Sequence, residues 1–263
     1  MQRPCVLVFA GSDPSGGAGI QADVQAIAAQ GAHALTVITA LTVQDNNRVH
    51  AVHAVSPELV WQQAQALIAS LPIAAVKLGI AGSRANSLVI ADVIRSIKLT
   101  QPGLPVVLDT VLGSGHGDAL AVDNAIDVIA PLLQVATLIT PNLPEAALLH
   151  PAADSLLEQA RHLLQNGCVD VLLKGGHGSS ELVSNRWLSK GADGWRKEWM
   201  WPRLQGEFHG SGCTLAAAIA AQLALGRAMD DALENGQAYC QQALTAAFVI
   251  GAGQLIPART KFH

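Results

Sequence analysis

The chain of 263 residues has a mass of 27.3 kDa, is 50% hydrophobic but only 4% aromatic, and carries a net charge of −4. This length suffices for one large α/β domain and the composition excludes a disordered chain, so we expect a single domain over residues 1–263 with an aliphatic core. The absence of any basic run argues against nucleic acid as a partner.

The first half of the chain alternates short apolar runs with segments of helical periodicity. Strands are expected at residues 4–10, 34–41, 49–55, 74–78 and 106–108, and helices at residues 20–30, 57–70 and 83–97. Such alternation predicts a mainly parallel sheet with helices on both faces. Residues 24–44 lack charge but contain glutamines and a glycine, so we interpret them as a helix followed by a strand and not as a membrane span.

The second half of the chain continues this pattern and ends in helices. Further helices are expected at residues 122–133, 156–165, 214–225 and 230–249, and further strands at residues 135–139 and 169–173. Residues 182–189 and 195–201 flank the turn sequence GADG, which predicts an antiparallel hairpin. No small-residue cleavage pattern follows the first apolar run, so we expect no signal peptide and a cytoplasmic protein.

Two glycine-rich segments precede predicted helices and are candidates for ligand binding. Residues 11–19 lack both the GxGxxG spacing of a dinucleotide loop and the GKS/T ending of a P-loop, so a simple turn remains an equal alternative there. Residues 208–214 precede the most apolar helix of the chain. Successive N–H groups of Gly210, Ser211 and Gly212 would point at one place, which predicts an anion hole.

The four cysteines are far apart and form no CxxC pair, which argues against a disulfide framework and a structural zinc site. Cys213 would lie in the first turn of a helix, the position at which the pKa of a thiol is lowered most. We therefore interpret Cys213 as a functional residue, with an inert thiol at a crowded helix start as the alternative. We interpret Cys5, Cys168 and Cys240 as inert.

Polar residues follow several predicted strands, at the edge where an open α/β sheet binds its ligands. Asp109, Asn142 and Glu145 offer the oxygen atoms that Mg²⁺ prefers. Lys174 closes another strand and is long enough to reach a phosphate oxygen. Gln44 ends the second strand, and its carboxamide combines a donor and an acceptor, as the edge of an aminopyrimidine requires. Each of these residues, taken singly, could also be a cap or a solvated surface group.

Seven short motifs occur in order along the chain. They are AGSDPSGGAGIQAD at residues 10–23, TALTVQ at 39–44, KLG at 77–79, LD at 108–109, ITPNLPEA at 139–146, LKGGH at 173–177 and HGSGCT at 209–214. Together they resemble the hydroxymethylpyrimidine/phosphomethylpyrimidine kinases of thiamine biosynthesis, in the ribokinase-like superfamily. The resemblance implies a three-layer α/β sandwich, a homodimer, and ATP with Mg²⁺ as cofactors. It also implies transfer of the ATP γ-phosphoryl group to the pyrimidine's hydroxymethyl group, and then to the resulting monophosphate.

The resemblance also implies roles for individual residues. The pyrimidine would be held by Gly11, Asp23 and Gln44, with Ile80 in the same pocket. The anion hole would be formed by Gly210, Ser211 and Gly212, and Cys213 would occupy the catalytic-base position. Mg²⁺ and its waters would be organised by Asn142 and Glu145, with Asp109 as a further ligand, and Lys174 would contact nucleotide phosphate. Phosphoryl transfer requires mainly positioning and neutralisation of charge, which backbone amides, Mg²⁺ and a lysine provide.

The chain departs from this family at three places. Ile80 stands where methionine is common, the loop at residues 113–117 has no lysine, and Gln237 stands where a lysine is frequent. Two alternatives remain. One is a pyridoxal or pyridoxine kinase, whose substrate also has a hydroxymethyl group on an aromatic nitrogen ring, and the other is a pyrimidine binder that has lost turnover. Gln44 favours the pyrimidine over vitamin B6, and retention of the acidic residues, Lys174 and Cys213 favours an active kinase.

Overall fold

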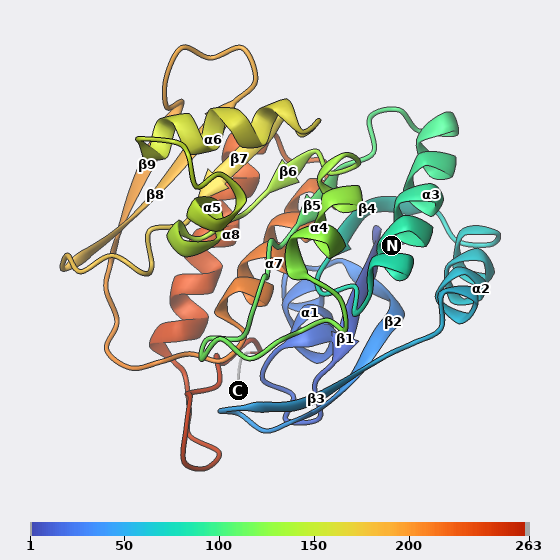
Figure 1. The fold of residues 1–263 in the computed structure, drawn as a ribbon, viewed down its shortest axis with the longest axis horizontal. Helices are drawn as coiled ribbons and strands as arrows, with labels where there is room; N and C mark the ends of the chain where they lie inside the picture. The colour runs from blue at the N-terminus through green and yellow to red at the C-terminus, as the bar shows by residue number, and fades with distance from the viewer. Residues whose placement is uncertain (1, 261–263) are drawn as a thin grey trace.

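A nine-stranded sheet runs through the centre of the protein (Figure 1). The computed structural model describes residues 2–260. The strands are β1 (Cys5–Ser12), β2 (His33–Gln44), β3 (Val49–Ala54), β4 (Ile73–Leu78), β5 (Val106–Leu108), β6 (Leu138–Ile139), β7 (Asp170–Leu173), β8 (Leu182–Ser189) and β9 (Lys197–Pro202). The helices are α1 (Gly19–Ala29), α2 (Pro57–Ile68), α3 (Arg84–Thr100), α4 (Ala125–Leu133), α5 (Leu143–Leu149), α6 (Leu156–Gln165), α7 (Ser211–Ala224) and α8 (Met229–Thr245).

The order of the strands brings six carboxyl ends to one edge of the sheet. This order is β3-β2-β1-β4-β5-β6-β7-β8-β9. Strands β2, β1, β4, β5, β6 and β7 are parallel. At one border β3 is antiparallel to β2, and at the other β8 is antiparallel to both β7 and β9. The chain passes from β1 to β2 on one side and later places β4 on the other side of β1. A reversal of this kind opens the crevice in which α/β proteins bind ligands.

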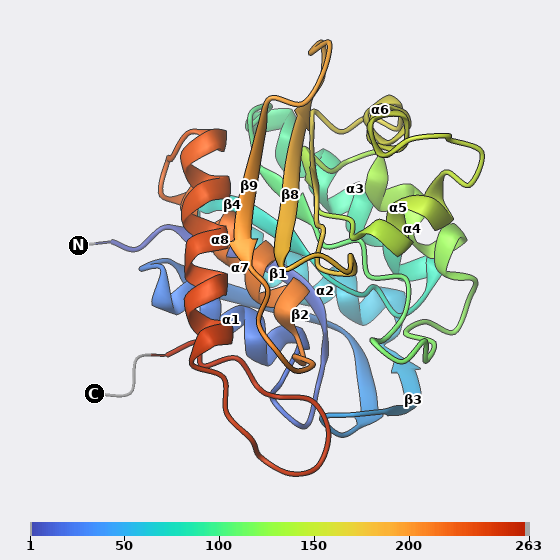
Figure 2. The same cartoon turned by 90° about the vertical axis from the view of Figure 1, so that its left-hand side faces the viewer.

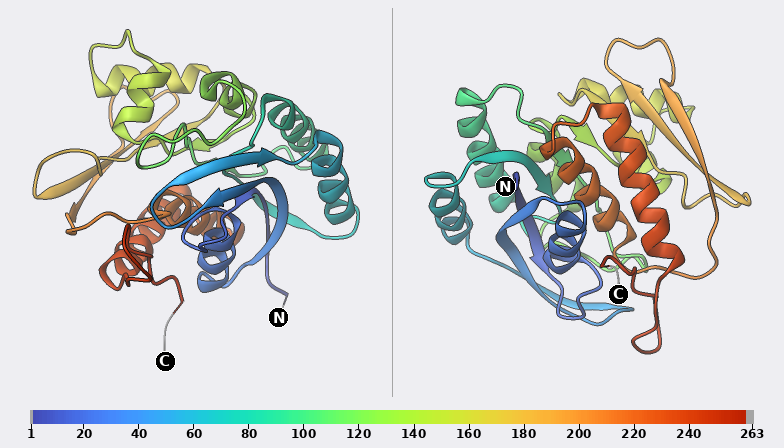
Figure 3. Two further views of the ribbon diagram at one scale, coloured as in Figure 1. Left: turned by 60° about the horizontal axis from the view of Figure 1, so that its bottom comes forward. Right: turned by 180° about the vertical axis from the view of Figure 1, so that it is seen from behind.

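Helices cover both faces of the sheet (Figures 2 and 3). Helices α1, α7 and α8 pack on one face, and α2 to α6 lie on the other. In β1, the buried Val6 and Val8 belong to the core beneath α1 and α7, while Leu7 and Phe9 belong to the core of the opposite layer. A strand that is buried on both faces needs no polar alternation, which explains its continuous apolar sequence.

The three-layer arrangement and the mainly parallel sheet confirm the prediction from the sequence, as does the antiparallel hairpin. The elements differ in detail. β1 continues through Gly11 and Ser12, which the sequence placed in a turn. Helix α4 begins at Ala125 and not at Val122, because the side chain of Asn124 caps it. Helix α5 was not predicted, since it has only seven residues. Among residues 2–260, no helix is both long and apolar enough to cross a membrane.

Candidate active site

The residues singled out from the sequence gather around the start of α7, at the carboxyl edge of the parallel strands. We call Asp109, Asn142, Glu145 and Lys174 the strand-end cluster. We call Gly11, Asp13, Gln44, Ile80 and His209 the loop cluster. The start of α7, residues 210–213, joins the two clusters, because it follows His209 in the chain and lies against Asp109 and Lys174 in space.

Asp109 and Lys174 form an ion pair against the first turn of α7. Lys174 Nζ lies 3.2 Å from Asp109 Oδ1, and the carboxylate is fully buried. The second oxygen atom, Asp109 Oδ2, is also buried and has no hydrogen-bond partner in the described part of the chain. A Cβ on Gly212 would lie 3.3 Å from Asp109 Oδ2 and 3.5 Å from Lys174 Nζ. A glycine at this position therefore keeps the approach between the helix start and the ion pair open to a ligand.

Asn142 and Glu145 form a capping box at the start of α5. Asn142 Oδ1 accepts a hydrogen bond from the Glu145 N–H at 2.8 Å, and Glu145 Oε2 accepts one from the Asn142 N–H at 2.8 Å. Thr110 Oγ1 also donates to Glu145 Oε2, at 3.1 Å, which ties α5 to the end of β5. Burial raises the pKa of Glu145, while the nearby Lys174 opposes this effect and Asp109 adds to it. Capping is thus one role of this pair, and the charge of Glu145 is linked to the Asp109–Lys174 pair.

The strand-end cluster suits a Mg²⁺ ion that is held largely by water and phosphate. No group of three or more His, Cys, Asp or Glu side chains that could hold a metal occurs within residues 2–260. At phosphate sites, Mg²⁺ usually keeps several waters and binds only one or two protein carboxylates. The partner-free Oδ2 of Asp109 and the nearby Glu145 carboxylate fit that requirement.

The start of α7 is shaped by contact between the two glycine-rich segments. Gly210 has a φ of +77°, in the left-handed region, and a Cβ there would collide with the carbonyl oxygen of Gly17. Position 210 therefore requires glycine. The N-cap of α7 makes no side-chain hydrogen bond. The first N–H groups of the helix thus stay available to an anion, as an anion hole at Gly210, Ser211 and Gly212 requires.

Cys213 lies in the first turn of α7 and is partly accessible to solvent. Burial raises the pKa of its thiol to about 12; Lys77 acts in the opposite direction, and Asp109 and Asp23 add to the increase. The expectation that the helix start lowers this pKa is therefore wrong, because desolvation and two nearby carboxylates outweigh the helix dipole. Cys213 is a neutral thiol near pH 7.

A fully buried ion pair lies close to Cys213. Lys77 Nζ is 2.8 Å from Asp23 Oδ2, and neither side chain is accessible to solvent. Burial raises the pKa of Asp23 to about 6, although Lys77 acts to lower it. Asp23 Oδ1 is buried and has no hydrogen-bond partner among residues 2–260. Asp23 therefore has only Oδ1 to offer a ligand. Lys77, to which the sequence analysis assigned no role, brings a positive charge near the thiol.

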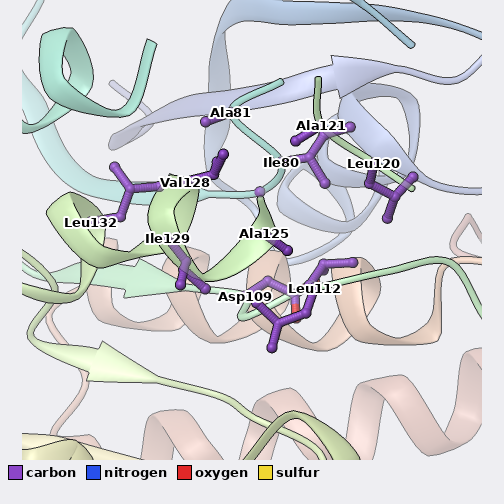
Figure 4. Close-up of a pocket in the computed structure, with 12 residues that line it drawn as sticks. Ile80, Ala81, Asp109, Leu112, Leu120, Ala121, Ala125, Val128, Ile129 and Leu132 are labelled. Carbon is purple, nitrogen blue, oxygen red and sulfur yellow. The ribbon is translucent and has the colours of Figure 1, made fainter. Parts of the chain in front are cut away.

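Gly11 and Ile80 pack against each other at the edge of an apolar cavity. A Cβ on Gly11 would lie 2.6 Å from Ile80 Cδ1. Ile80 lines the cavity together with Asp109, Leu112 and Ala121. Figure 4 shows Asp109 and Leu112 at one end of it and Ile80 and Ala121 at the other. The cavity thus connects the side chain predicted for the pyrimidine pocket with a carboxylate predicted for Mg²⁺.

Gln44, at the end of β2, contacts a histidine from a distant part of the chain. Gln44 Nε2 lies 3.3 Å from His209 Nε2, and the same imidazole nitrogen lies 2.8 Å from Asp13 Oδ2. Burial acts to raise the pKa of Asp13, but hydrogen bonds from His209, Ser15 and Ala18 outweigh it, so the pKa is lowered. Asp13 is therefore a carboxylate at neutral pH. Asp13 and His209 belong to two of the motifs, but neither motif predicts a role for them.

Arg259 is a buried cation that the sequence analysis did not identify. Its Nε donates to Thr214 Oγ1 at 2.8 Å, and its Nη2 donates to the carbonyl oxygens of Gly17 and His209. Its Nη1 is buried without a hydrogen-bond partner in the described part of the chain. Arg259 therefore fastens the first glycine-rich segment to the start of α7. A single arginine far from every motif gives no signal in the sequence.

Gln237, at the position where the family resemblance predicts a lysine, is buried in α8 and hydrogen-bonded. Its Oε1 accepts from Asn185 Nδ2 at 2.9 Å and from Trp201 Nε1 at 3.1 Å. Asn185 Oδ1 in turn accepts from the N–H of Gly175 at 2.9 Å. Gln237 thus supports the loop that follows Lys174 and adds no charge to it.

Sequence comparisons relate the chain to one family. The family described as phosphomethylpyrimidine kinase matches residues 13–257. A Mycobacterium tuberculosis protein named hydroxymethylpyrimidine/phosphomethylpyrimidine kinase is 39% identical over 259 residues, which cover 96% of this chain and 92% of that protein. A multifunctional thiamine biosynthesis protein of Corynebacterium efficiens is 35% identical over 260 residues, and the chain spans 34% of its length.

Solved structures share the fold. The pyridoxal kinase of Bacillus subtilis, solved as an ADP complex, has a TM-score of 0.85 at 24% identity, with 98% of each chain covered. The phosphomethylpyrimidine kinase of Clostridium difficile has a TM-score of 0.76 at 31% identity, covering 92% of this chain and 100% of that one. The predicted ribokinase-like arrangement is thereby confirmed.

Proposed function

The chain belongs to the phosphomethylpyrimidine kinase family and is a kinase, and we propose that it transfers the γ-phosphoryl group of ATP to 4-amino-5-hydroxymethyl-2-methylpyrimidine and to its monophosphate. One observation carries the proposal: the start of α7 faces the Asp109–Lys174 pair and also presents Cys213. A phosphoryl group bound at this helix start would have the thiol beside it. The hydroxyl group of an acceptor bound in the loop cluster would then lie between the phosphoryl group and the thiol.

The strand-end cluster and α7 would bind the transferred group. N–H groups at residues 210–212 donate to its oxygen atoms, and Lys174 contributes its positive charge. Asp109 and Glu145 would hold Mg²⁺, with Asn142 ordering Glu145 through the capping box, and the ion would neutralise charge on the phosphates. Positioning and neutralisation of charge account for most of the catalysis of phosphoryl transfer.

Cys213 would act on the acceptor hydroxyl as a neutral thiol. With a pKa of about 12, the thiol keeps its own proton near pH 7 and cannot deprotonate the hydroxyl before the reaction begins. Its sulfur would orient the hydroxyl by accepting its hydrogen bond. As the new O–P bond forms and the bond to ADP breaks, the hydroxyl proton would pass to an oxygen atom of the transferred phosphoryl group, because a loose transition state requires little prior deprotonation of the nucleophile.

The loop cluster would hold the pyrimidine ring. Gly11 allows the backbone to approach the ring closely, Ile80 supplies apolar contact and Gln44 supplies hydrogen bonds. Asp23 would contribute through Oδ1, which has no hydrogen-bond partner among residues 2–260. The family resemblance supports a homodimer, which light scattering of the purified protein tests. The use of ATP supports a cytoplasmic location.

An ADP-release assay with both pyrimidine acceptors and pyridoxal tests the proposal. We expect turnover of at least one pyrimidine, faster than turnover of pyridoxal, and complete dependence on added Mg²⁺. Turnover of pyridoxal alone would identify a pyridoxal kinase. Binding of a pyrimidine in calorimetry without turnover of any acceptor would identify a non-catalytic binder.

A further inference from the structure

One imidazole nitrogen is shared between Asp13 and Gln44. His209 Nε2 lies 2.8 Å from Asp13 Oδ2 and 3.3 Å from Gln44 Nε2. An ionised carboxylate only accepts hydrogen bonds, so the shorter contact requires a proton on His209 Nε2. Asp13 thus selects the imidazole tautomer in which Nε2 is the donor.

This tautomer is incompatible with an amide NH₂ group facing the same nitrogen. Two N–H donors cannot hydrogen-bond to each other, whereas a carboxamide oxygen in that place shares the Nε2–H with Asp13. A half-turn of the Gln44 carboxamide exchanges its oxygen and nitrogen without moving the rest of the chain. We propose that His209 and Asp13 are positioning residues that hold Gln44 with Oε1 toward the imidazole and its NH₂ group toward the acceptor.

The surroundings hold the imidazole in one place. A Cβ on Gly17 would collide with the His209 ring, so the ring packs directly against the glycine-rich backbone. Asp13 Oδ2 also accepts hydrogen bonds from the Ala18 N–H at 2.7 Å and from Ser15 Oγ at 3.0 Å. The side chains of Asp13 and His209 are only 3% and 16% exposed. Neither partner is free to turn and release the Gln44 carboxamide.

The orientation of Gln44 determines which acceptors the pocket selects. Its oxygen atom is occupied by His209, so the group left for the ligand is a pair of N–H donors. Such donors recognise a lone pair, for example that of an unprotonated ring nitrogen, and they reject a C–H or an N–H at the same place. The ligand of Gln44 is thus a heteroaromatic alcohol with an unprotonated ring nitrogen. This inference rests on the proposed function, which supplies the acceptor that Gln44 contacts.

Two substitutions of Gln44 test its orientation. Glu retains an acceptor for His209 but offers the ligand no donor, so Gln44→Glu should lower kcat/KM for the pyrimidine about as much as Gln44→Leu does, by roughly 10- to 100-fold. The KM for ATP should change less than about twofold in both variants. If Gln44→Glu keeps the acceptor kcat/KM within about threefold of wild type while Gln44→Leu loses it, the oxygen faces the ligand and the proposal is overturned.

A deaza analogue of the pyrimidine, with C–H in place of the ring nitrogen, provides the complementary test. It should be a poor acceptor for the wild type, and this discrimination should be largely lost in Gln44→Leu. His209→Phe should raise the KM for the pyrimidine by about 5- to 20-fold and leave the KM for ATP unchanged. His33→Phe, at an exposed histidine that begins β2, is the control and should change neither constant. Equal changes of both KM values in His209→Phe would contradict a role in positioning Gln44.

Two-bond ¹H–¹⁵N correlation spectra of the imidazoles give a readout that does not depend on turnover. The signals that disappear in His209→Phe belong to His209. In the wild type, these signals should show protonation at Nε2 alone. Protonation at Nδ1 alone would overturn the proposal even in an active enzyme. A protein that shows the Nε2 tautomer but phosphorylates no pyrimidine would instead overturn the proposed function.

Discussion

The loop cluster and the strand-end cluster differ in how far their polar groups are satisfied by hydrogen bonds within the protein. In the loop cluster, polar groups from distant segments satisfy one another, and Asp13 accepts hydrogen bonds from Ser15, Ala18 and His209. In the strand-end cluster, Asp109 has a buried oxygen atom beside Lys174 that no group of residues 2–260 hydrogen-bonds. A satisfied network fixes a shape, whereas an unsatisfied buried oxygen favours a cation. Under the proposed function, the loop cluster is therefore a recognition surface that is formed in advance, and the strand-end cluster is a charged site that its ligands complete.

The two clusters also rest on different parts of the fold. Asp109 and Lys174 follow directly after buried strands, which hold them rigidly. Asp13 and His209 lie on loops, which depend on contacts with each other. Substitutions in the strand-end cluster should therefore affect the rate and the nucleotide, and those in the loop cluster should affect the acceptor. Four substitutions test this division.

Asp109→Asn should have the largest effect. It removes the carboxylate proposed for Mg²⁺ and the counter-ion of Lys174, so kcat should fall by roughly 10³- to 10⁵-fold. Asparagine has nearly the same shape, and thermal unfolding should confirm that the variant is folded. Loss of less than about tenfold in kcat at saturating Mg²⁺ would place the critical charge elsewhere.

Cys213→Ala should lower kcat by roughly 10²- to 10⁴-fold with little change in nucleotide affinity. Cys168→Ala is a matched control, because burial also raises the pKa of that thiol to about 12 and it lies in the core. A Cys213→Ala variant with nearly wild-type turnover would remove the cysteine from the mechanism.

The raised pKa of Cys213 also predicts the shape of the pH profile. A pKa raised to about 12 shifts thiolate formation to higher pH, so the thiol stays protonated between about pH 6 and pH 9. The kcat of the wild type should therefore show no increase from thiolate formation in this range. An increase with an apparent pKa near 8 that disappears in Cys213→Ser would show that the thiolate is the active form.

Asn185→Leu should have a smaller effect, confined to the nucleotide. It removes the link between Gln237 and the Gly175 N–H, so the loop after Lys174 loses a support. The KM for ATP should rise by about 3- to 10-fold and the KM for the acceptor should not change. Trp201→Phe is the control, since it removes the other donor to Gln237 and leaves the link to Gly175 intact.

Ile80→Met should have the smallest effect, on the choice between acceptors. Isoleucine is stiff at χ1, so it adapts less well to the bare ring, whereas a monophosphate has its own anchor in the backbone amides. We expect the wild type to prefer the monophosphate in kcat/KM, and Ile80→Met to narrow that preference by about 2- to 5-fold. A clear preference of the wild type for the unphosphorylated alcohol would refute this explanation.

Much of the fold follows from local sequence. Apolar runs such as that of β1 and the helical spacing of α1 are local patterns, and the structure places both elements close to the predicted bounds. Helix α5 was missed because seven residues are too few to show periodicity. For its capping pair, Asn142 and Glu145, the sequence predicted oxygen ligands, with a cap as the alternative for each residue taken singly.

The candidate site was less predictable, because it depends on distant contacts and on burial. Asp13 and His209 are 196 residues apart, and no local pattern pairs them. The pKa of Cys213 was predicted in the wrong direction, since the helix start is visible in the sequence but desolvation is not. Residues 109, 174 and 44 were proposed as site residues because strand ends can be predicted from apolar runs in the sequence.

The contacts of Arg259 have a practical consequence for how the protein is purified. Tyr239 donates a hydrogen bond to the carbonyl oxygen of Arg259 at 2.8 Å, and the guanidinium enters the interior beside Thr214. An affinity tag fused shortly after Arg259 would disturb these contacts and, through them, the positions of both glycine-rich segments. A tag on the amino-terminal side, ahead of β1, would be attached at the edge of the sheet opposite the candidate site. Activity measured with a carboxyl-terminal tag should therefore be compared with that of protein from which the tag has been cleaved.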